Sequence, residues 1–124
     1  MSAAIEPLAT EAFQTNIVWN EDHVLLELSG NADLRVWREL GRLLKDMHAE
    51  ILGRGLQRVV VDVTQLEFMN SSCFKSVVSW LTDIIELAPD HQYRVHFKSN
   101  PATLWQRRSL HALRSFALMI VSVE

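Results

Sequence analysis

The chain has few of the residues that define several classes of protein. Its 124 residues include one cysteine, three prolines and four glycines. One cysteine excludes an intrachain disulfide, and so little proline and glycine is untypical of low-complexity segments. No apolar run approaches the roughly 20 residues that a membrane helix needs, so we expect no direct membrane insertion. The first ten residues lack the basic and apolar regions of a signal peptide, which favours a cytoplasmic protein.

Several functional signatures are also missing. The net charge is −3, so general attraction to nucleic acid is not expected. The five histidines are scattered, and no pair has the spacing of metal ligands on a helix, so we expect no metal. Gly53 and Gly55 lack the further glycines and the lysine of a phosphate-binding loop. Without a clustered acid, base or cofactor motif, we expect neither a cofactor nor enzymatic activity.

The composition is that of a folded domain. About half of the residues (48%) are hydrophobic and 22% are charged, which is typical of globular proteins. The length suits one domain with one core. We expect residues 1–15 to be a flexible N-terminal arm and residues 16–124 to form a single domain.

Hydrophobic periodicity predicts an alternating order of strands and helices. Continuous or alternating apolar runs indicate strands, and apolar residues at steps of three and four indicate helices. The predicted strands are 17–19, 23–28, 58–63, 93–97 and 119–123. The predicted helices are 34–52, 72–87 and one that opens at Asn100 and Pro101. This β-β-α-β-α-β-α-β order indicates an α/β fold with a mixed, partly parallel sheet of four to five strands and three to four packed helices.

The most informative segment joins the central strand to the second helix. The valine-rich run Val59–Val63 predicts a central strand covered on both faces. A short connection, 64–69, then delivers Asn70, Ser71 and Ser72 to the start of the helix. The first backbone N–H groups of a helix lack partners and carry partial positive charge. A hydroxyl at this position is well placed to carry a phosphate.

This segment resembles the signature of the STAS domain family, typified by anti-anti-sigma factors. The family motif is a hydrophobic strand, then Asp, then Leu-x-Phe-Met-Asp-Ser-Ser/Thr-Gly-Leu at the start of a helix. Residues 66–74 (Leu-Glu-Phe-Met-Asn-Ser-Ser-Cys-Phe) align with it without a gap, although Asn70 and Cys73 replace the family's Asp and Gly. The predicted order of elements from Ile17 to Val123 also matches the family.

The resemblance implies a function and a site. It implies a protein-interaction module of a bacterial partner-switching circuit, similar to an anti-sigma factor antagonist and controlled by phosphorylation of Ser71, with Ser72 as the alternative acceptor. Its partners would be a serine kinase of the anti-sigma type and a phosphatase, and a weak homodimer is left open. The expected partner-binding residues are Met69, Asn70, Ser71, Ser72, Cys73, Phe74 and Lys75.

Other interpretations of the same residues remain open at this stage. Some STAS domains are constitutive subunits of membrane transport complexes that stabilise an ATPase partner. Ser71 and Ser72 are also ordinary helix caps, and Cys73 is either a small partly buried side chain or a redox-active thiol. A catalytic serine is a weaker alternative. The cations that follow Trp105 favour either a solvated helix face or a docking patch for an acidic partner.

Overall fold

The computed structural model describes residues 5–124, which form one five-stranded mixed sheet with α-helices packed on it. The strands are β1 (Phe13–Trp19), β2 (Val24–Ala32), β3 (Arg58–Met69), β4 (Arg94–Lys98) and β5 (Val121–Val123). The α-helices are α1 (Trp37–Arg54), α2 (Ser71–Ile85) and α3 (Leu104–Phe116). Two short 3₁₀ helices, η1 (Leu34–Val36) and η2 (Pro89–His91), precede α1 and β4. The order of strands and α-helices predicted from the sequence is confirmed.

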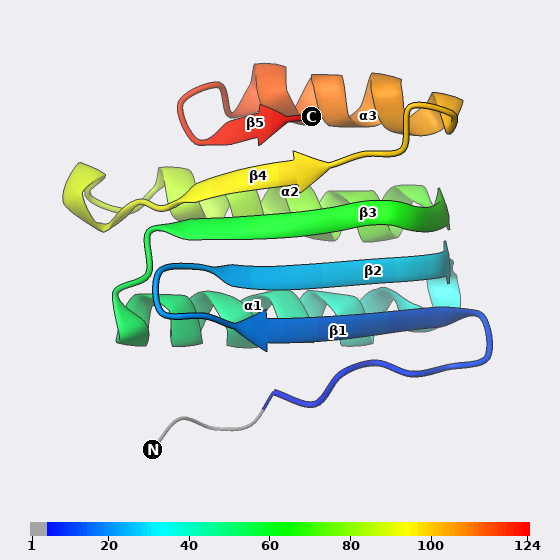
Figure 1. The fold of residues 1–124 in the computed structure, drawn as a ribbon, viewed down its shortest axis with the longest axis horizontal. Coiled ribbons are helices and arrows are strands. Elements are labelled where there is room, and N and C mark those ends of the chain that lie inside the picture. The colour runs from blue at the N-terminus through cyan, green and yellow to red at the C-terminus, as the bar shows by residue number, and fades with distance from the viewer. Residues whose placement is uncertain (1–4) are drawn as a thin grey trace.

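The strands lie in the sheet in the order in which they occur along the chain. β1 pairs antiparallel with β2, and all other neighbours are parallel. The parallel strands therefore end at one edge of the sheet, where the α-helices begin (Figure 1). We call this edge the carboxyl edge; it is the usual location of functional sites in α/β sheets.

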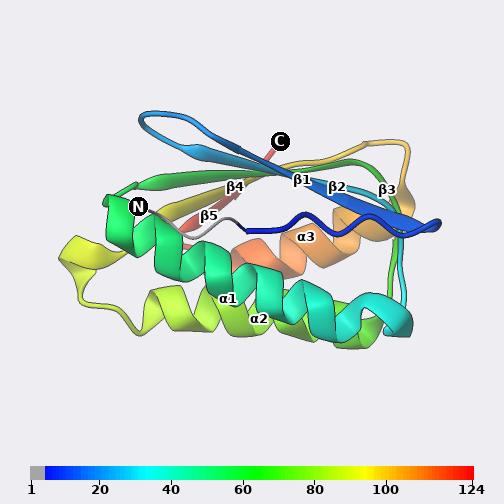
Figure 2. The same cartoon turned by 90° about the horizontal axis from the view of Figure 1, so that it is seen from below.

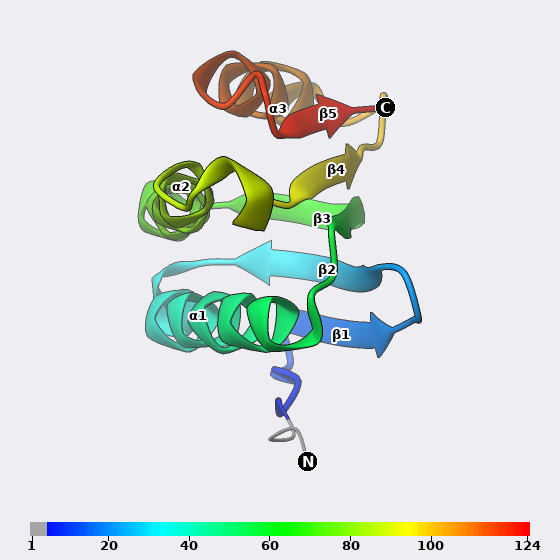
Figure 3. The same ribbon diagram turned by 90° about the vertical axis from the view of Figure 1, so that its left-hand side faces the viewer.

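All three α-helices cover the same face of the sheet (Figures 2 and 3). In β3, Val59, Val61 and Val63 are buried on this face, whereas Asp62 and Thr64 lie on the opposite face and are partly exposed. β3 is the central strand, as predicted, but the expected cover on both faces is incomplete, because the helices lie on one face and Asp62 and Thr64 on the other are partly exposed. Val60 on the helix-free face is buried because it lies in register between side chains of the two neighbouring strands.

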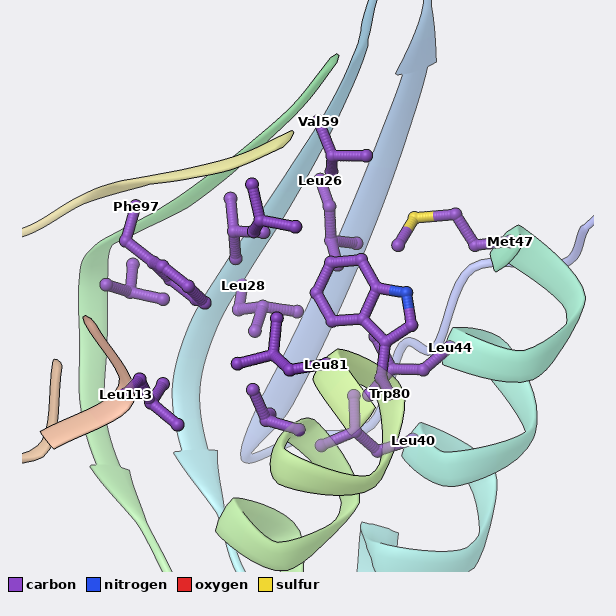
Figure 4. Packing of buried hydrophobic residues seen from close by; sticks show 14 of the residues in the cluster. Leu26, Leu28, Leu40, Leu44, Met47, Val59, Trp80, Leu81, Phe97 and Leu113 are labelled. Carbon is purple, nitrogen blue, oxygen red and sulfur yellow. The ribbon is translucent and has the colours of Figure 1, made fainter. Parts of the chain in front are cut away.

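The core lies between the sheet and the helices, and Trp80 of α2 occupies its middle. Its indole lies among Leu40 and Leu44 of α1 and the apolar face of β2 (Figure 4). The indole Nε1 donates a 2.7 Å hydrogen bond to the hydroxyl of Tyr93, and that oxygen also lies 2.7 Å from Nδ1 of His48. A buried polar network therefore joins α1, α2 and the residue before β4.

Three strands are longer than predicted. β1 begins at Phe13 rather than Ile17, and β2 continues through Gly30 to Ala32. β3 continues to Met69, so the prediction of a connection at 64–69 is wrong. The extensions of β2 and β3 pair with each other beyond Val63, with two shifts of register on the way. Pairing between two segments that lack apolar alternation is a tertiary effect and gives no local signal.

The predicted N-terminal arm is described from Ile5 onwards; residues 1–4 lie outside the described residues. Leu8 exchanges two hydrogen bonds with Thr15, through the Thr15 hydroxyl (2.7 Å) and its backbone N–H (2.8 Å). The N–H of Thr10 donates to the carbonyl of Phe13 at 2.8 Å. Residues 8–10 are thus attached to β1, and residues 13–15 belong to it. Flexibility of the arm stays a prediction.

The third helix begins later than predicted. Asn100 is not its cap: the side-chain oxygen of Asn100 accepts from the N–H of Ala102 in a turn, and α3 starts only at Leu104. The displacement follows from Gln106, whose buried side chain accepts from the N–H of Asn100 at 2.8 Å. This contact holds the turn against the helix, so the local capping signal is overridden.

Candidate functional site

The turn between β3 and α2 is held by the residue that precedes Ser71. Asn70 donates its N–H to the carbonyl of Ala32, at the end of β2, over 2.9 Å. Its side-chain oxygen accepts from the N–H of Cys73 at 2.8 Å, which makes Asn70 the N-cap of α2. An asparagine caps a helix as well as an aspartate does. The capping role considered for the two serines therefore belongs to Asn70.

Ser71 is the first residue of α2 and is exposed. Within residues 5–124, the hydroxyl of Ser71 forms no hydrogen bond. In the same range, the backbone N–H groups of Ser71 and Ser72 have no acceptor. These two N–H groups carry the partial positive charge of the helix N-terminus. The hydroxyl is thus free to be modified, and a negative charge added there would be stabilised by the helix.

The other predicted contact residues divide by burial. Lys75 is exposed, one turn beyond Ser71, whereas Ser72 and Phe74 are half-buried. Met69 is also half-buried and pairs with Ala32 at the end of β3. These side chains present some surface at the carboxyl edge.

Cys73 is the exception, because its side chain is completely buried. Its thiol lies 3.4 Å from the carbonyl of Asp33. Burial raises the pKa of the thiol to about 11, so the reactive thiolate is disfavoured despite the nearby helix N-terminus. The structure corrects the inclusion of Cys73 among the contact residues, and it does not support the redox interpretation.

Exposed apolar side chains lie at the carboxyl edge of the sheet, where α2 also begins. Leu34, Trp37, Phe68 and Leu104 are 64%, 39%, 46% and 76% exposed. Each one ends a parallel strand or follows it, so all four lie at the same carboxyl edge as Ser71 (Figure 1). We call these four residues the apolar rim. Exposed apolar side chains gathered around polar groups are characteristic of protein-binding surfaces.

The apolar rim was not predicted, because Leu34, Trp37 and Leu104 fall within the apolar patterns of the predicted helices. The carboxyl edge was the available signal: residues just after parallel strands come together there, whatever their helical periodicity.

The α3 segment considered as a basic docking patch contains both exposed and buried side chains. Arg107, Arg108 and Arg114 are exposed, but Gln106 is fully buried. Its amide donates to the carbonyls of Val63 and Leu66. The indole of Trp105 donates to the carbonyl of Glu67 at 2.7 Å, so this side chain ties α3 to β3.

Residues 5–124 contain no group of three or more His, Cys, Asp or Glu side chains arranged to hold a metal ion. None of the helices in this range is both long and apolar enough to cross a bilayer.

Comparison with known proteins identifies the fold. No protein-family model and no curated protein sequence matches the chain. An anti-sigma factor antagonist from Mycobacterium paratuberculosis is similar in structure with a TM-score of 0.65 at 15% identity, over 87% of this chain and 85% of the other. The Bacillus cell fate determinant SpoIIAA in its phosphorylated form gives 0.57 at 18% identity, over 91% of both chains. Unphosphorylated SpoIIAA gives 0.53 at 19% identity, over 78% of this chain and 80% of the other. The chain is a STAS-like α/β domain.

Proposed function

We propose that the chain is a protein-interaction module of the anti-sigma factor antagonist type, switched by phosphorylation of Ser71. One observation carries the proposal: Ser71 is exposed, free of the capping role, and lies at the same carboxyl edge of the sheet as the apolar rim. A free hydroxyl inside a docking surface is what a phosphorylation switch requires. The similarity to SpoIIAA, which is known in both phosphorylated and unphosphorylated forms, supports it.

The switch works by changing the surface rather than the fold. The unmodified protein binds its partner through the apolar rim and the exposed residues around Ser71. A phosphate adds a charge of about −1.5 to −2 at a helix N-terminus, where the free N–H groups of Ser71 and Ser72 stabilise it. The domain stays folded, but the hydrated phosphate now lies in an apolar surface and opposes docking. The partners are a serine kinase of the anti-sigma type and a phosphatase, and the setting is the cytoplasm.

Ser72 is the alternative acceptor, and burial favours Ser71 over it. Ser72 is half-buried, and its carbonyl accepts from the hydroxyl of Ser76 at 3.3 Å. A kinase must bring the hydroxyl into its own active site, which is easier for an exposed side chain at the first position of a helix.

A second candidate function is a constitutive STAS subunit that stabilises an ATPase in a membrane transport complex. Asn70 favours it, because the cap is retained without the negative charge that the family motif has beside the phosphoacceptor. In this case Ser71 would remain unmodified, and the same surface would hold its partner permanently.

Catalysis by Ser71 has no support from its surroundings, because no histidine forms a hydrogen bond with its hydroxyl. Within residues 5–124, the one Ser–His–carboxylate chain is formed by Ser122, His96 and Glu124, with His96 2.6 and 2.9 Å from its two partners. These side chains lie on the helix-free face and join β5 to β4.

The proposal is tested by capturing partners from the native host with three variants as baits. Ser71→Ala removes the acceptor and should bind the partner as well as the unmodified protein does. Ser71→Asp adds a charge that the helix N-terminus tolerates, so it should fold normally yet retain much less partner. Ser115→Asp is the matched control, because Ser115 is an exposed serine near the far end of α3. Quantitative mass spectrometry measures the capture and circular dichroism the folding.

Equal capture by folded Ser71→Ala and Ser71→Asp would overturn the switch and favour the constitutive subunit. Equal loss in Ser71→Asp and Ser115→Asp would show a general effect of charge instead.

A further inference from the structure

A groove lies between α1 and α2, and Ser72 is one of the residues that line it. It has a volume of about 750 Å³. Ser72, Ser76 and Ser79 line it from α2, at steps of four and three residues, and Gly41 of α1 faces Ser76. α1 and α2 are in contact below the groove, since a Cβ at Gly41 would lie 3.6 Å from the Ser76 hydroxyl, and the small side chains leave the surface above this contact concave.

The walls of this groove are basic. Arg38, Arg42 and Lys45 line it from α1, and Lys75 lines it from α2. All four are exposed, and no carboxylate within residues 5–124 forms an ion pair with any of them.

Two acidic side chains, Asp46 and Asp83, also line the groove, so four cations face two carboxylates there. The chain as a whole carries a net charge of −3. This local excess of positive charge without ion-pair partners favours binding of an anionic group, because complementary charge selects a partner and sets its orientation.

We propose that the groove between α1 and α2 binds an acidic helical segment of a partner protein. The α1 cations follow a spacing of four and three residues, so they form one row on the helix. The row from Arg38 to Lys45 spans about 10 Å, which equals roughly two turns of a docked helix. Carboxylates at the same spacing on that helix would face the row. The serine hydroxyls of α2 supply hydrogen bonds at the opposite wall.

The proposal extends the proposed function without depending on phosphorylation. Ser72 and Trp37 both line the groove, and Trp37 also belongs to the apolar rim. A partner that docks on the rim therefore has a continuous path into the groove. The binding of an acidic helix, however, is set by the cations of α1 and Lys75 and can be measured with Ser71 unmodified.

The cations of α3 provide a matched comparison. Arg107 and Arg108 are exposed and free of ion pairs with residues 5–124, like the groove cations. They differ in lying outside this groove. Reversing two charges on α3 thus alters the net charge as much as reversing two in the groove.

The test is a titration of the full chain with an alanine-based peptide of about 15 residues, long enough to form some helix, that carries glutamates spaced four and three apart. Binding is followed residue by residue in two-dimensional NMR spectra at low ionic strength. We expect shifts confined to α1 and α2 around the groove. The double variant Arg42→Glu, Lys45→Glu should bind about tenfold more weakly or not at all, and Arg107→Glu, Arg108→Glu should bind like the wild type.

Three results would overturn the proposal. The first is equal weakening in both double variants, which would show nonspecific attraction. The second is undiminished binding of a peptide with glutamine in place of every glutamate. The third is binding to vesicles that contain phosphatidylserine, lost in Arg42→Glu, Lys45→Glu, together with no binding of the acidic peptide. None of these results bears on the switch at Ser71, whose test uses other variants and a different readout.

Discussion

Gln106 links the start of α3 to β3, and its replacement by leucine tests how the carboxyl edge is held together. The side-chain amide donates to the carbonyls of Val63 and Leu66 at 2.7 and 2.9 Å, and its oxygen accepts from the N–H of Asn100 at 2.8 Å. Leucine has a similar volume but leaves all three backbone groups without this partner. Both carbonyl bonds are buried, and an unpaired buried group costs about 1–3 kcal/mol. We therefore expect Gln106→Leu to lower the free energy of unfolding by about 3 kcal/mol.

Urea unfolding, followed by circular dichroism, measures this change. With a slope of about 2 kcal/mol per molar urea, the midpoint should fall by about 1.5 M. Gln106→Glu is the control: its carboxylate still accepts from Asn100 but repels the two carbonyls, so it should be at least as destabilising at neutral pH. Protonation of this carboxylate at acid pH restores one hydrogen-bond donor, so the difference in the free energy of unfolding between Gln106→Glu and the wild type should become smaller. A leucine variant within about 0.5 kcal/mol of wild type would refute this account of Gln106.

Three further predictions concern single positions. Gly30 has a φ of +87°, and a Cβ there would lie 2.0 Å from the carbonyl oxygen of Ala12. Gly30→Ala should therefore lower the free energy of unfolding by more than about 2 kcal/mol. Gly53→Ala, at a position in α1 with open space around it, should raise the free energy of unfolding by up to about 1 kcal/mol. Equal melting temperatures for the two variants would contradict this. Burial lowers the pKa of His48, so the unfolded chain binds the proton more readily than the folded chain does. The free energy of unfolding should therefore decline as the pH falls below 6.5, the ordinary pKa of histidine. A decline of the same size in His48→Gln would show that another group is responsible. The buried thiol of Cys73, whose pKa is raised to about 11, should not react with Ellman's reagent at pH 8 until urea unfolds the protein, and rapid reaction in the native state would disprove its burial.

The order of elements could be predicted from the sequence because it depends on local patterns. The apolar periodicity over residues 34–52 is such a pattern, and it predicted α1, which ends at Gly55 with a φ of +68°. The valine run of β3 likewise predicted a central strand. The same run led us to expect too much burial on the second face of the strand, where Val60 is shielded by side chains of the neighbouring strands and no helix packs.

The missed features all depend on contacts between distant residues. The extension of β3 to Met69 exists because β2 extends beside it, and α3 starts late because Gln106 points inward to β3. A glutamine between Trp105 and two arginines gives no local sign of burial.

At the site, the position of Ser71 at the start of α2 followed from the motif, whereas the capping role considered for the serines belongs to Asn70. The apolar rim and the basic groove were not predicted, since the rim combines residues from separate strand–helix connections and the groove combines side chains of two helices.

Phosphosite mapping of the protein purified from its native host tests the central claim most directly. The account predicts one phosphate in the segment between Arg58 and Lys75, located on Ser71, present in the free protein and absent from the protein recovered with its partner. Fragment spectra distinguish Ser71 from Ser72, and Ser115 serves as the internal comparison, since it is also exposed but lies away from the carboxyl edge. Phosphate on neither Ser71 nor Ser72, with the partner bound throughout growth, would contradict the switch.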